Sequence, residues 1–200
     1  MTNHLIIFCK APHLGTVKSR LARDIGAIAA AAFYRRNLKD TFNRLRSDKR
    51  WTCRPAITPD RAARENGPWP RGIPCFPQGE GDLGRRMDRA MRRPPPGPVV
   101  LIGADTPGIT PAHIAAAFKA LGNHDAVFGP AADGGFWLVG MKRSPAMPYL
   151  YANVRWSTEH ALADTIKNLP SGFTHALVDT LHDVDDGADY ARWRNLRNLA

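Results

Sequence analysis

One cationic segment and two acidic turns of this chain carry residue types that suit the binding of a polyphosphate. The cationic segment spans residues 10–20, and the acidic turns contain Asp105 and Asp185. Each follows a short apolar run that reads as a strand, at residues 5–8, 99–102 and 176–179. In open α/β sheets, ligands collect at the carboxyl ends of strands. The pattern therefore predicts a site in which protein cations and a divalent metal hold a polyphosphate.

The cationic segment offers several groups that hold phosphates. A loop between a strand and a helix presents backbone N–H groups and the positive end of the helix dipole. Gly15 allows the backbone to approach a ligand closely, and Pro12 stiffens the turn. Lys10, Lys18 and Arg20 suit the negative charge of a departing diphosphate or triphosphate. The segment matches neither a Walker loop nor G-x-G-x-x-G, and an alternative in which Lys18 and Arg20 are solvated helix residues stays open.

The two acidic turns are candidate metal ligands. Asp105 lies two residues beyond the run 99–102, in the turn Gly-Ala-Asp-Thr-Pro. There it could help hold a Mg²⁺ or Mn²⁺ ion that bridges phosphates, since such ions use one or two carboxylates plus water. Each aspartate also has a simpler explanation. Asp105 would form an Asx turn before a helix, and Asp185 would suit a helix N-terminus.

The composition limits the class of protein. The chain has 200 residues, 44% of them apolar, enough to bury a core as one domain over residues 1–200. Lys and Arg number 28 against 18 Asp and Glu, and the net charge of +10 favours anionic partners. The three cysteines show no C-x-x-C spacing, which fits a reducing cytoplasm. No apolar run approaches about 18 residues and no signal-peptide pattern is present. We expect a cytoplasmic protein with no membrane span.

Strand-like and helix-like segments alternate along the chain. The expected strands are residues 4–9, 54–58, 99–102, 126–128 and 136–141. The first helix is expected to begin near Thr16, with an interruption at Gly26. Further helices are expected to begin at Asp82, at Thr110, at Ser157 or Thr158, and at Asp186 or Asp189. Pro111 would stand in the first turn of the helix that begins at Thr110. This alternation predicts an α/β fold, a single-domain three-layer α/β/α arrangement with a mostly parallel central sheet.

Five stretches of the chain, taken in order, resemble the motifs of one bacterial family. They are residues 7–22, 78–87, 101–107, 129–137 and 156–158. That family is described as glycosyltransferase-like, with a glycosyltransferase A type fold. It is similar to 2-phospholactate guanylyltransferases and to nucleotide-diphospho-sugar transferases. The resemblance implies that fold, and it implies a metal-dependent transferase that uses a nucleotide-activated donor.

The resemblance also implies roles for the matching positions. Phosphate contacts would come from Lys10, Gly15, Lys18 and Arg20, with Pro12 in the same loop. The segment from Gln78 through Gly81 to Gly84 would read the base, and Arg86 follows closely enough to touch phosphate. The metal ligand would be Asp105. The acceptor side would be shaped by Asp133, Gly134 and Gly135, with Trp137 as a stacking wall, and the catalytic residues would be Asp105, Lys18 and Asp133.

The second metal ligand departs from the family pattern. In sugar-activating relatives this ligand lies in an Asp-Thr-Pro-Glu-Asp turn before the final helix. Here the chain reads Asp185-Asp-Gly-Ala-Asp189, so Asp185 keeps the carboxylate while Thr-Pro-Glu is absent. The resemblance therefore ranks Asp105 above Asp185 as a metal ligand.

Three functions remain open from the sequence. A glycosyltransferase would bind a nucleotide-diphospho-sugar and a small-molecule acceptor, with Asp133 as the candidate base. A nucleotidyltransferase would bind a nucleoside triphosphate and release pyrophosphate, and the lack of a second Asp after Asp105 favours this reaction. A nucleic-acid-binding module would explain the charge, but aromatic residues are only 8% and do not interleave with a basic stretch, so we expect no nucleic acid partner.

Overall fold

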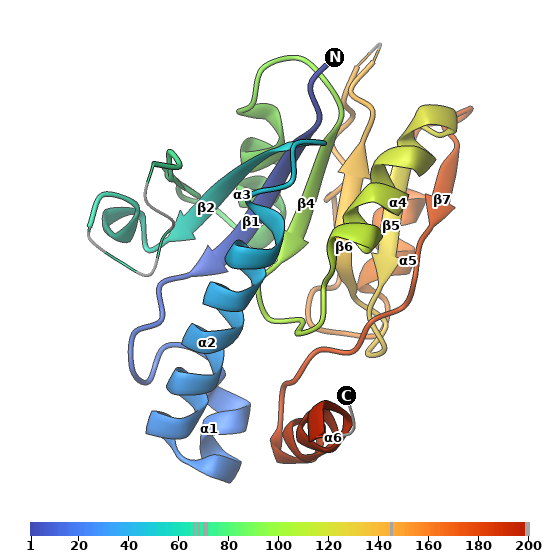
Figure 1. Ribbon diagram of the computed structural model, residues 1–200. Coiled ribbons are helices and arrows are strands. Elements are labelled where there is room, and N and C mark those ends of the chain that lie inside the picture. The colour runs from blue at the N-terminus through green and yellow to red at the C-terminus, as the bar shows by residue number, and fades with distance from the viewer. Residues whose placement is uncertain (66, 68, 70–71, 145, 199–200) are drawn as a thin grey trace.

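A seven-stranded sheet forms the centre of the computed structural model, which describes residues 1–65, 67, 69, 72–144 and 146–198 (Figure 1). The strand order is β3-β2-β1-β4-β6-β5-β7. The strands are β1 (His4–Lys10), β2 (Thr52–Thr58), β3 (Phe76–Pro77), β4 (Val99–Gly103), β5 (Ala126–Pro130), β6 (Phe136–Met141) and β7 (His175–Leu177). Strand β6 pairs antiparallel with β4 and β5, and the other pairs are parallel. The prediction of a mostly parallel sheet is confirmed.

Helices cover both faces of this sheet, which confirms the three-layer prediction (Figure 1). Helices α2 (Ala27–Leu45) and α4 (Pro111–Asn123) lie on one face. Helices α3 (Leu83–Arg92) and α5 (Ala161–Lys167) lie on the other. Helix α1 (Ser19–Ile25), the short 3-10 helix η1 (Asp60–Ala63) and helix α6 (Gly187–Asn198) complete the described elements. No helix in the described part of the chain is both long and apolar enough to cross a membrane.

The central strands are buried on both faces, so the sheet separates two hydrophobic clusters. Along β1, Leu5 and Ile7 belong to the cluster under α2 and α4. Between them, Ile6 belongs to the cluster under α3 and α5. Because successive side chains of a strand point to opposite faces, a doubly covered strand reads as a continuous apolar run. This explains why the run at the start of the chain predicts a buried strand.

A third cluster holds α6 beyond the carboxyl edge of the sheet. Phe33 of α2 contacts the rings of Tyr190 and Trp193, with centroid distances of 5.3 and 5.0 Å. Leu21 of α1 and Val184, just before α6, are buried in the same cluster. The segment between β7 and α6 is therefore held across the end of the sheet, close to α1 (Figure 1).

Two helix boundaries follow the sequence signals closely. Gly26, at φ 87°, separates α1 from α2 as predicted. At α4, the side chain of Thr110 accepts a hydrogen bond from the backbone N–H of His113, and the His113 ring accepts one from the Thr110 N–H. Pro111 occupies the first turn, where its missing N–H costs nothing.

Two other predicted helix starts are wrong. Helix α1 begins at Ser19 after Lys18, because the hydroxyl of Thr16 instead donates to the His13 carbonyl within a turn. Helix α5 begins at Ala161 rather than after Ser157 or Thr158. The Thr158 hydroxyl instead donates to the Arg155 carbonyl and accepts from the His160 N–H within a turn that precedes the helix.

Candidate functional site

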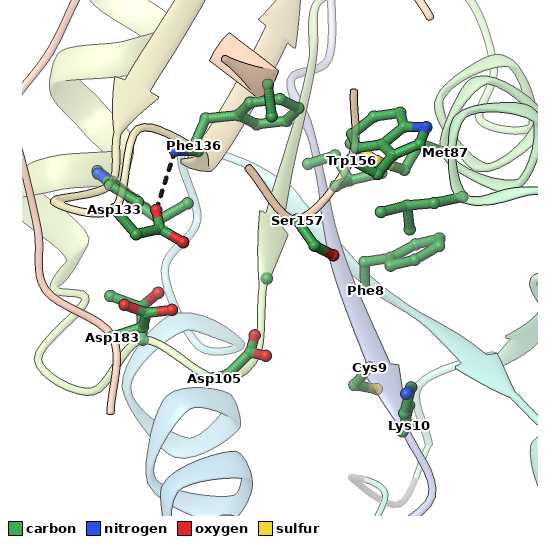
Figure 2. A pocket seen from close by; sticks show the side chains of 18 of the residues that line it. Phe8, Cys9, Lys10, Met87, Asp105, Asp133, Phe136, Trp156, Ser157 and Asp183 are labelled. Atoms are coloured by element: carbon green, nitrogen blue, oxygen red, sulfur yellow. Dashed lines mark hydrogen bonds between the residues drawn. The ribbon is translucent and has the colours of Figure 1, made fainter. Parts of the chain in front are cut away.

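A cavity of about 480 Å³ opens at the carboxyl edge of the sheet (Figure 2). Its walls bring together groups that are far apart in the sequence. The charged residues that line it include Lys10, Lys18, Asp105, Asp133 and Asp183. The cationic segment and both acidic turns therefore meet at the edge where the sequence pattern places a ligand.

Lys18 is a buried cation between two carboxylates. Its side chain is only 5% exposed, and its Nζ lies 2.8 Å from Asp185 Oδ1 and 3.7 Å from Asp105 Oδ2. Burial by itself would lower the pKa of Lys18, but the carboxylates of Asp105 and Asp185 outweigh burial and raise that pKa. Lys18 therefore stays charged at neutral pH, and it joins the β4 turn to the segment before α6.

Asp183 lines the cavity beside these residues, although the sequence reasoning did not select it. Burial, followed by the neighbouring charge of Asp185, raises the pKa of Asp183 to about 6. Lys18 opposes this shift, whereas Asp133 and Asp105 add to it. Four carboxylates thus share one electrostatic neighbourhood. The available sequence signal was the run Asp-Val-Asp-Asp, in which Asp183 stands two positions before Asp185.

The carboxylates suit a hard divalent cation that brings further ligands with it. In the described residues, no group of three or more His, Cys, Asp or Glu side chains is arranged to hold a metal ion. Mg²⁺ is commonly bound by one or two carboxylates, with substrate phosphates and water completing its shell. Asp105, which is 55% exposed, can offer such a carboxylate, and Asp183 or Asp185 can offer the second. The donor set therefore fits a metal ion that arrives with a phosphate.

Two polar side chains of α2 hold the strand ends that carry the site. The hydroxyl of Tyr34 accepts a hydrogen bond from the Lys10 N–H at 3.0 Å and donates to the Lys10 carbonyl at 3.2 Å. The amide of Asn37 donates to the Ala104 carbonyl at 2.9 Å. Both residues stand on the buried face of α2, where polar groups require partners. In the sequence, their position on the apolar face of this helix was the signal that could have identified them.

Gln78 cross-links the sheet to α3. Its amide nitrogen donates to the carbonyls of Cys9 and Ala56, both at 3.0 Å, and its Oε1 accepts from Arg86 Nη1 at 3.1 Å. Both N–H groups of this buried amide are thus engaged with the protein. Gln78 and Arg86 both line the cavity, with Gln78 holding the Arg86 guanidinium in place.

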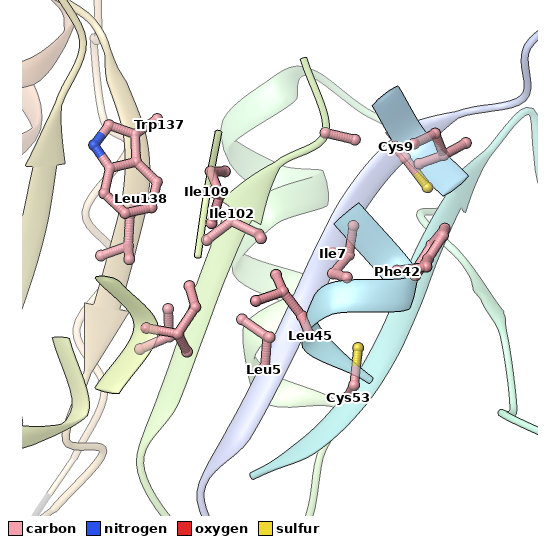
Figure 3. Close-up of a cluster of buried hydrophobic side chains, with 14 of the residues drawn as sticks. Leu5, Ile7, Cys9, Phe42, Leu45, Cys53, Ile102, Ile109, Trp137 and Leu138 are labelled. Atoms are coloured by element: carbon pink, nitrogen blue, oxygen red, sulfur yellow. The ribbon is translucent and has the colours of Figure 1, made fainter. Parts of the chain in front are cut away.

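Trp137 is buried rather than open to a ligand. It is 3% exposed, and its indole N–H donates to the Asp179 carbonyl at 2.9 Å. Figure 3 shows it among core side chains such as Leu138 and Ile109. Only an edge of this ring can border the cavity, which leaves little surface for the stacking expected from the resemblance.

The remaining expected residues do not line the cavity. They are Pro12, Gly15, Arg20, Gly81, Gly84, Gly134 and Asp185. Arg20 is 62% exposed and its Nη1 lies 3.7 Å from Asp185 Oδ2, so it extends the charged network outward. Gly84 lets α3 approach its neighbours, because a Cβ there would overlap Tyr151 and crowd Trp156.

The loop from β5 to β6 positions Asp133. Its Oδ1 accepts a hydrogen bond from the Gly135 N–H at 2.9 Å, marked by the dashed line in Figure 2. Gly134 has a φ of +85°, and a Cβ at that position would overlap the backbone of Glu159. The carbonyl of Gly134 also accepts a hydrogen bond from the Leu162 N–H of α5 at 3.2 Å. The loop is therefore packed directly on the start of α5.

We expect Gly134→Ala to lower the free energy of unfolding by about 2–5 kcal/mol, measured by urea denaturation. The left-handed conformation costs an alanine roughly 1–2 kcal/mol, and overlap with backbone adds about 1–3 kcal/mol. Gly172→Ala is the matched control, since Gly172 has a φ of +84° and open space where a Cβ would stand. Equal losses in the two variants would contradict the close packing on Glu159.

Comparisons with known proteins agree with this architecture. Residues 41–158 match the family model described as "Uncharacterized protein conserved in bacteria (DUF2064)". A crystal structure from Desulfovibrio desulfuricans G20, provisionally described as a nucleotide-diphospho-sugar transferase, is similar to this chain with a TM-score of 0.88 and 25% identity. The match covers 99% of this chain and 89% of that chain. Among curated proteins, no sequence matches this chain significantly.

More distant structures share the fold alone. The 4-diphosphocytidyl-2C-methyl-D-erythritol synthase of Anaerococcus prevotii has a TM-score of 0.62 and 10% identity, covering 98% of this chain and 96% of its own. Rv0371c of Mycobacterium tuberculosis, solved in complex with manganese, has a TM-score of 0.53 and 15% identity, covering 96% and 97%. The expected resemblance to nucleotide-sugar transferase and nucleotidyltransferase folds is confirmed.

Proposed function

Because the matched residues 41–158 are more than half of the chain, it belongs to the family described as "Uncharacterized protein conserved in bacteria (DUF2064)", and we propose that it is a metal-dependent transferase with a nucleotide-activated donor. The favoured donor is a nucleotide-diphospho-sugar. The observation that supports this most is the meeting of a buried Lys18 with the carboxylates of Asp105 and Asp185 at the mouth of the cavity. The similar Desulfovibrio structure supports the same donor class.

Different residues at the cavity take different parts of the proposed reaction. Lys10, Lys18 and Arg20 bind the diphosphate and stabilise the charge that develops as it leaves. Asp105 with Asp183 or Asp185 would hold Mg²⁺ or Mn²⁺, and that ion would neutralise phosphate charge. The bond from the anomeric carbon to the diphosphate breaks, and a bond from an acceptor oxygen to that carbon forms. The nucleoside diphosphate keeps the electron pair, and the acceptor proton passes to Oδ2 of Asp133, the oxygen not bonded to Gly135.

A second candidate is nucleotidyl transfer. An ionised acceptor oxygen would attack the α-phosphorus of a nucleoside triphosphate, and pyrophosphate would leave along the same cations. The turn at Asp105 favours this candidate, because it reads Asp-Thr-Pro and carries a single carboxylate. The second carboxylate comes from the separate segment before α6. The two reactions differ in their products, which are a nucleoside diphosphate or pyrophosphate.

We expect nucleotide-diphospho-sugars to raise the melting temperature of the protein only when Mn²⁺ or Mg²⁺ is present. A ligand at a hundred times its Kd stabilises the folded state by about 2.7 kcal/mol, which a thermal-shift panel detects readily. Nucleoside triphosphates belong in the same panel, and the best binder is then assayed for its released product. If no nucleotide stabilises the protein at saturating metal, the transferase proposal fails.

A further inference from the structure

One half of the cavity is apolar. The residues of this half, called here the apolar half, are Phe8, Leu83, Met87, Leu101, Phe136 and Trp156. Figure 2 shows Phe8, Met87 and Trp156 together, across the cavity from Asp105, Asp133 and Asp183. The cavity therefore has one side that suits charged groups and another side that suits apolar groups.

The apolar half is an open binding surface as well as the edge of the core. Phe8, Phe136 and Trp156 pack against the cluster under α3 and α5 but are only partly buried. The rings of Phe136 and Trp156 lie 6.3 Å apart at an angle of 57°, and Trp156 lies 5.9 Å from the ring of Tyr151. Neighbouring rings thus hold Trp156 in place. A set of apolar side chains exposed to a cavity favours a ligand that covers them.

Arg86 is a cation that borders this surface. Arg86 stands three positions after Leu83 on α3, so these two side chains are neighbours, and both line the cavity with Met87. One N–H of Arg86 donates to Gln78, and its Nε has no partner among the described residues. A guanidinium has five N–H donors, so several remain for an anionic group. The apolar half and Arg86 together suit a molecule with an apolar body and one anion.

A nucleobase fits this surface poorly. Bases carry ring nitrogens and exocyclic groups that require hydrogen-bond partners once they are buried. Both N–H groups of the Gln78 amide are already engaged. The Thr158 hydroxyl donates to the Arg155 carbonyl and accepts from the His160 N–H. The Gln78 N–H groups and the Thr158 hydroxyl are therefore not available to replace the hydrogen bonds to water that a buried base would lose.

We propose that the apolar half binds the acceptor, and that this acceptor has an apolar or aromatic body and one carboxylate or phosphate that pairs with Arg86. The assignment of this ligand as the acceptor rests on the proposed function, in which the donor diphosphate occupies the charged side. A polyhydroxylated sugar is disfavoured as acceptor, because its hydroxyls would face Phe8, Phe136 and Trp156 without partners.

Three small probes test this preference by calorimetric titration of the whole protein. The probes are 3-phenylpropionate, gluconate, which has the anion with a hydroxylated body, and 3-phenylpropanol, which has the ring without the anion. We expect 3-phenylpropionate to bind at least tenfold more tightly than either control. Equal or tighter binding of gluconate would overturn the proposal. Displacement of 3-phenylpropionate by a free nucleoside would also overturn it, since the surface would then be a base site.

Two variants assign the binding to the named residues. Trp156→Ala is expected to weaken the binding of 3-phenylpropionate at least fivefold, while Trp156→Phe retains most of the affinity. Arg86→Met is expected to reduce the ratio of the Kd values of 3-phenylpropanol and 3-phenylpropionate to less than twofold. This ratio is a readout that does not depend on Trp156. Unchanged probe binding in both Trp156→Ala and Arg86→Met would overturn the proposal. A parallel nucleotide titration keeps the proposed function separate, because its failure would leave the ranking of the three probes unaffected.

Discussion

Asp105→Asn is expected to reduce the transfer activity by about a hundredfold or more, because it removes a carboxylate that would hold the divalent metal at the phosphates. The side chain is 55% exposed, and it forms an ion pair with Lys18 at 3.7 Å. An ion pair with so exposed a partner contributes little to folding, about 1 kcal/mol or less. The variant should therefore melt near the wild type while losing metal-dependent nucleotide binding.

Asp179→Asn is the matched control for Asp105→Asn. Asp179 also follows a strand of the sheet, but its side chain is 74% exposed and does not line the cavity. Its backbone carbonyl, which accepts from Trp137, is unaffected by the change. We expect this control to keep activity within twofold of the wild type in a product-release assay. More than a tenth of wild-type activity in Asp105→Asn would contradict the assigned role.

Lys18→Met is expected to weaken binding of the preferred nucleotide by about tenfold to a hundredfold, since a hydrogen bond to a charged group contributes about 1.5–3 kcal/mol. The change also removes the cation that lies between Asp105 and Asp185. The remaining carboxylates would then repel a polyphosphate. Titration with nucleotide at saturating Mn²⁺ measures the loss, and Lys39→Met on α2 makes the same charge change at an exposed position. Similar losses in both variants would show that net charge, rather than Lys18, determines affinity.

The sequence predicted those parts of the site that depend on local signals. The turn at Asp105 follows a buried strand, and the carboxyl end of a strand in an α/β sheet is a place where ligands bind. The cap at Thr110 with Pro111 depends only on residues within one turn. Neither feature requires knowledge of the distant chain.

Other parts of the site depend on contacts that no local pattern reveals. The φ of 49° at Lys18 moves the start of α1 and directs the side chain between two carboxylates. Whether Trp137 faces a ligand or the core depends on its contact with Asp179, 42 residues away. The apolar half combines Phe8 of β1 with Trp156 from the segment before α5, and only folding brings them together.

The ion pairs of Lys18 have a thermodynamic consequence for how ligands enter. With Asp105 and Asp185 as its partners, the ammonium exerts little net attraction on an anion that arrives alone. A divalent cation that engages those carboxylates frees Lys18 for phosphate, and a phosphate that engages Lys18 frees the carboxylates for the cation. Each ligand must then raise the affinity of the other by the same factor, as thermodynamic linkage requires. The protein would thereby discriminate against bare anions such as sulfate and respond to the metal–nucleotide complex as a unit.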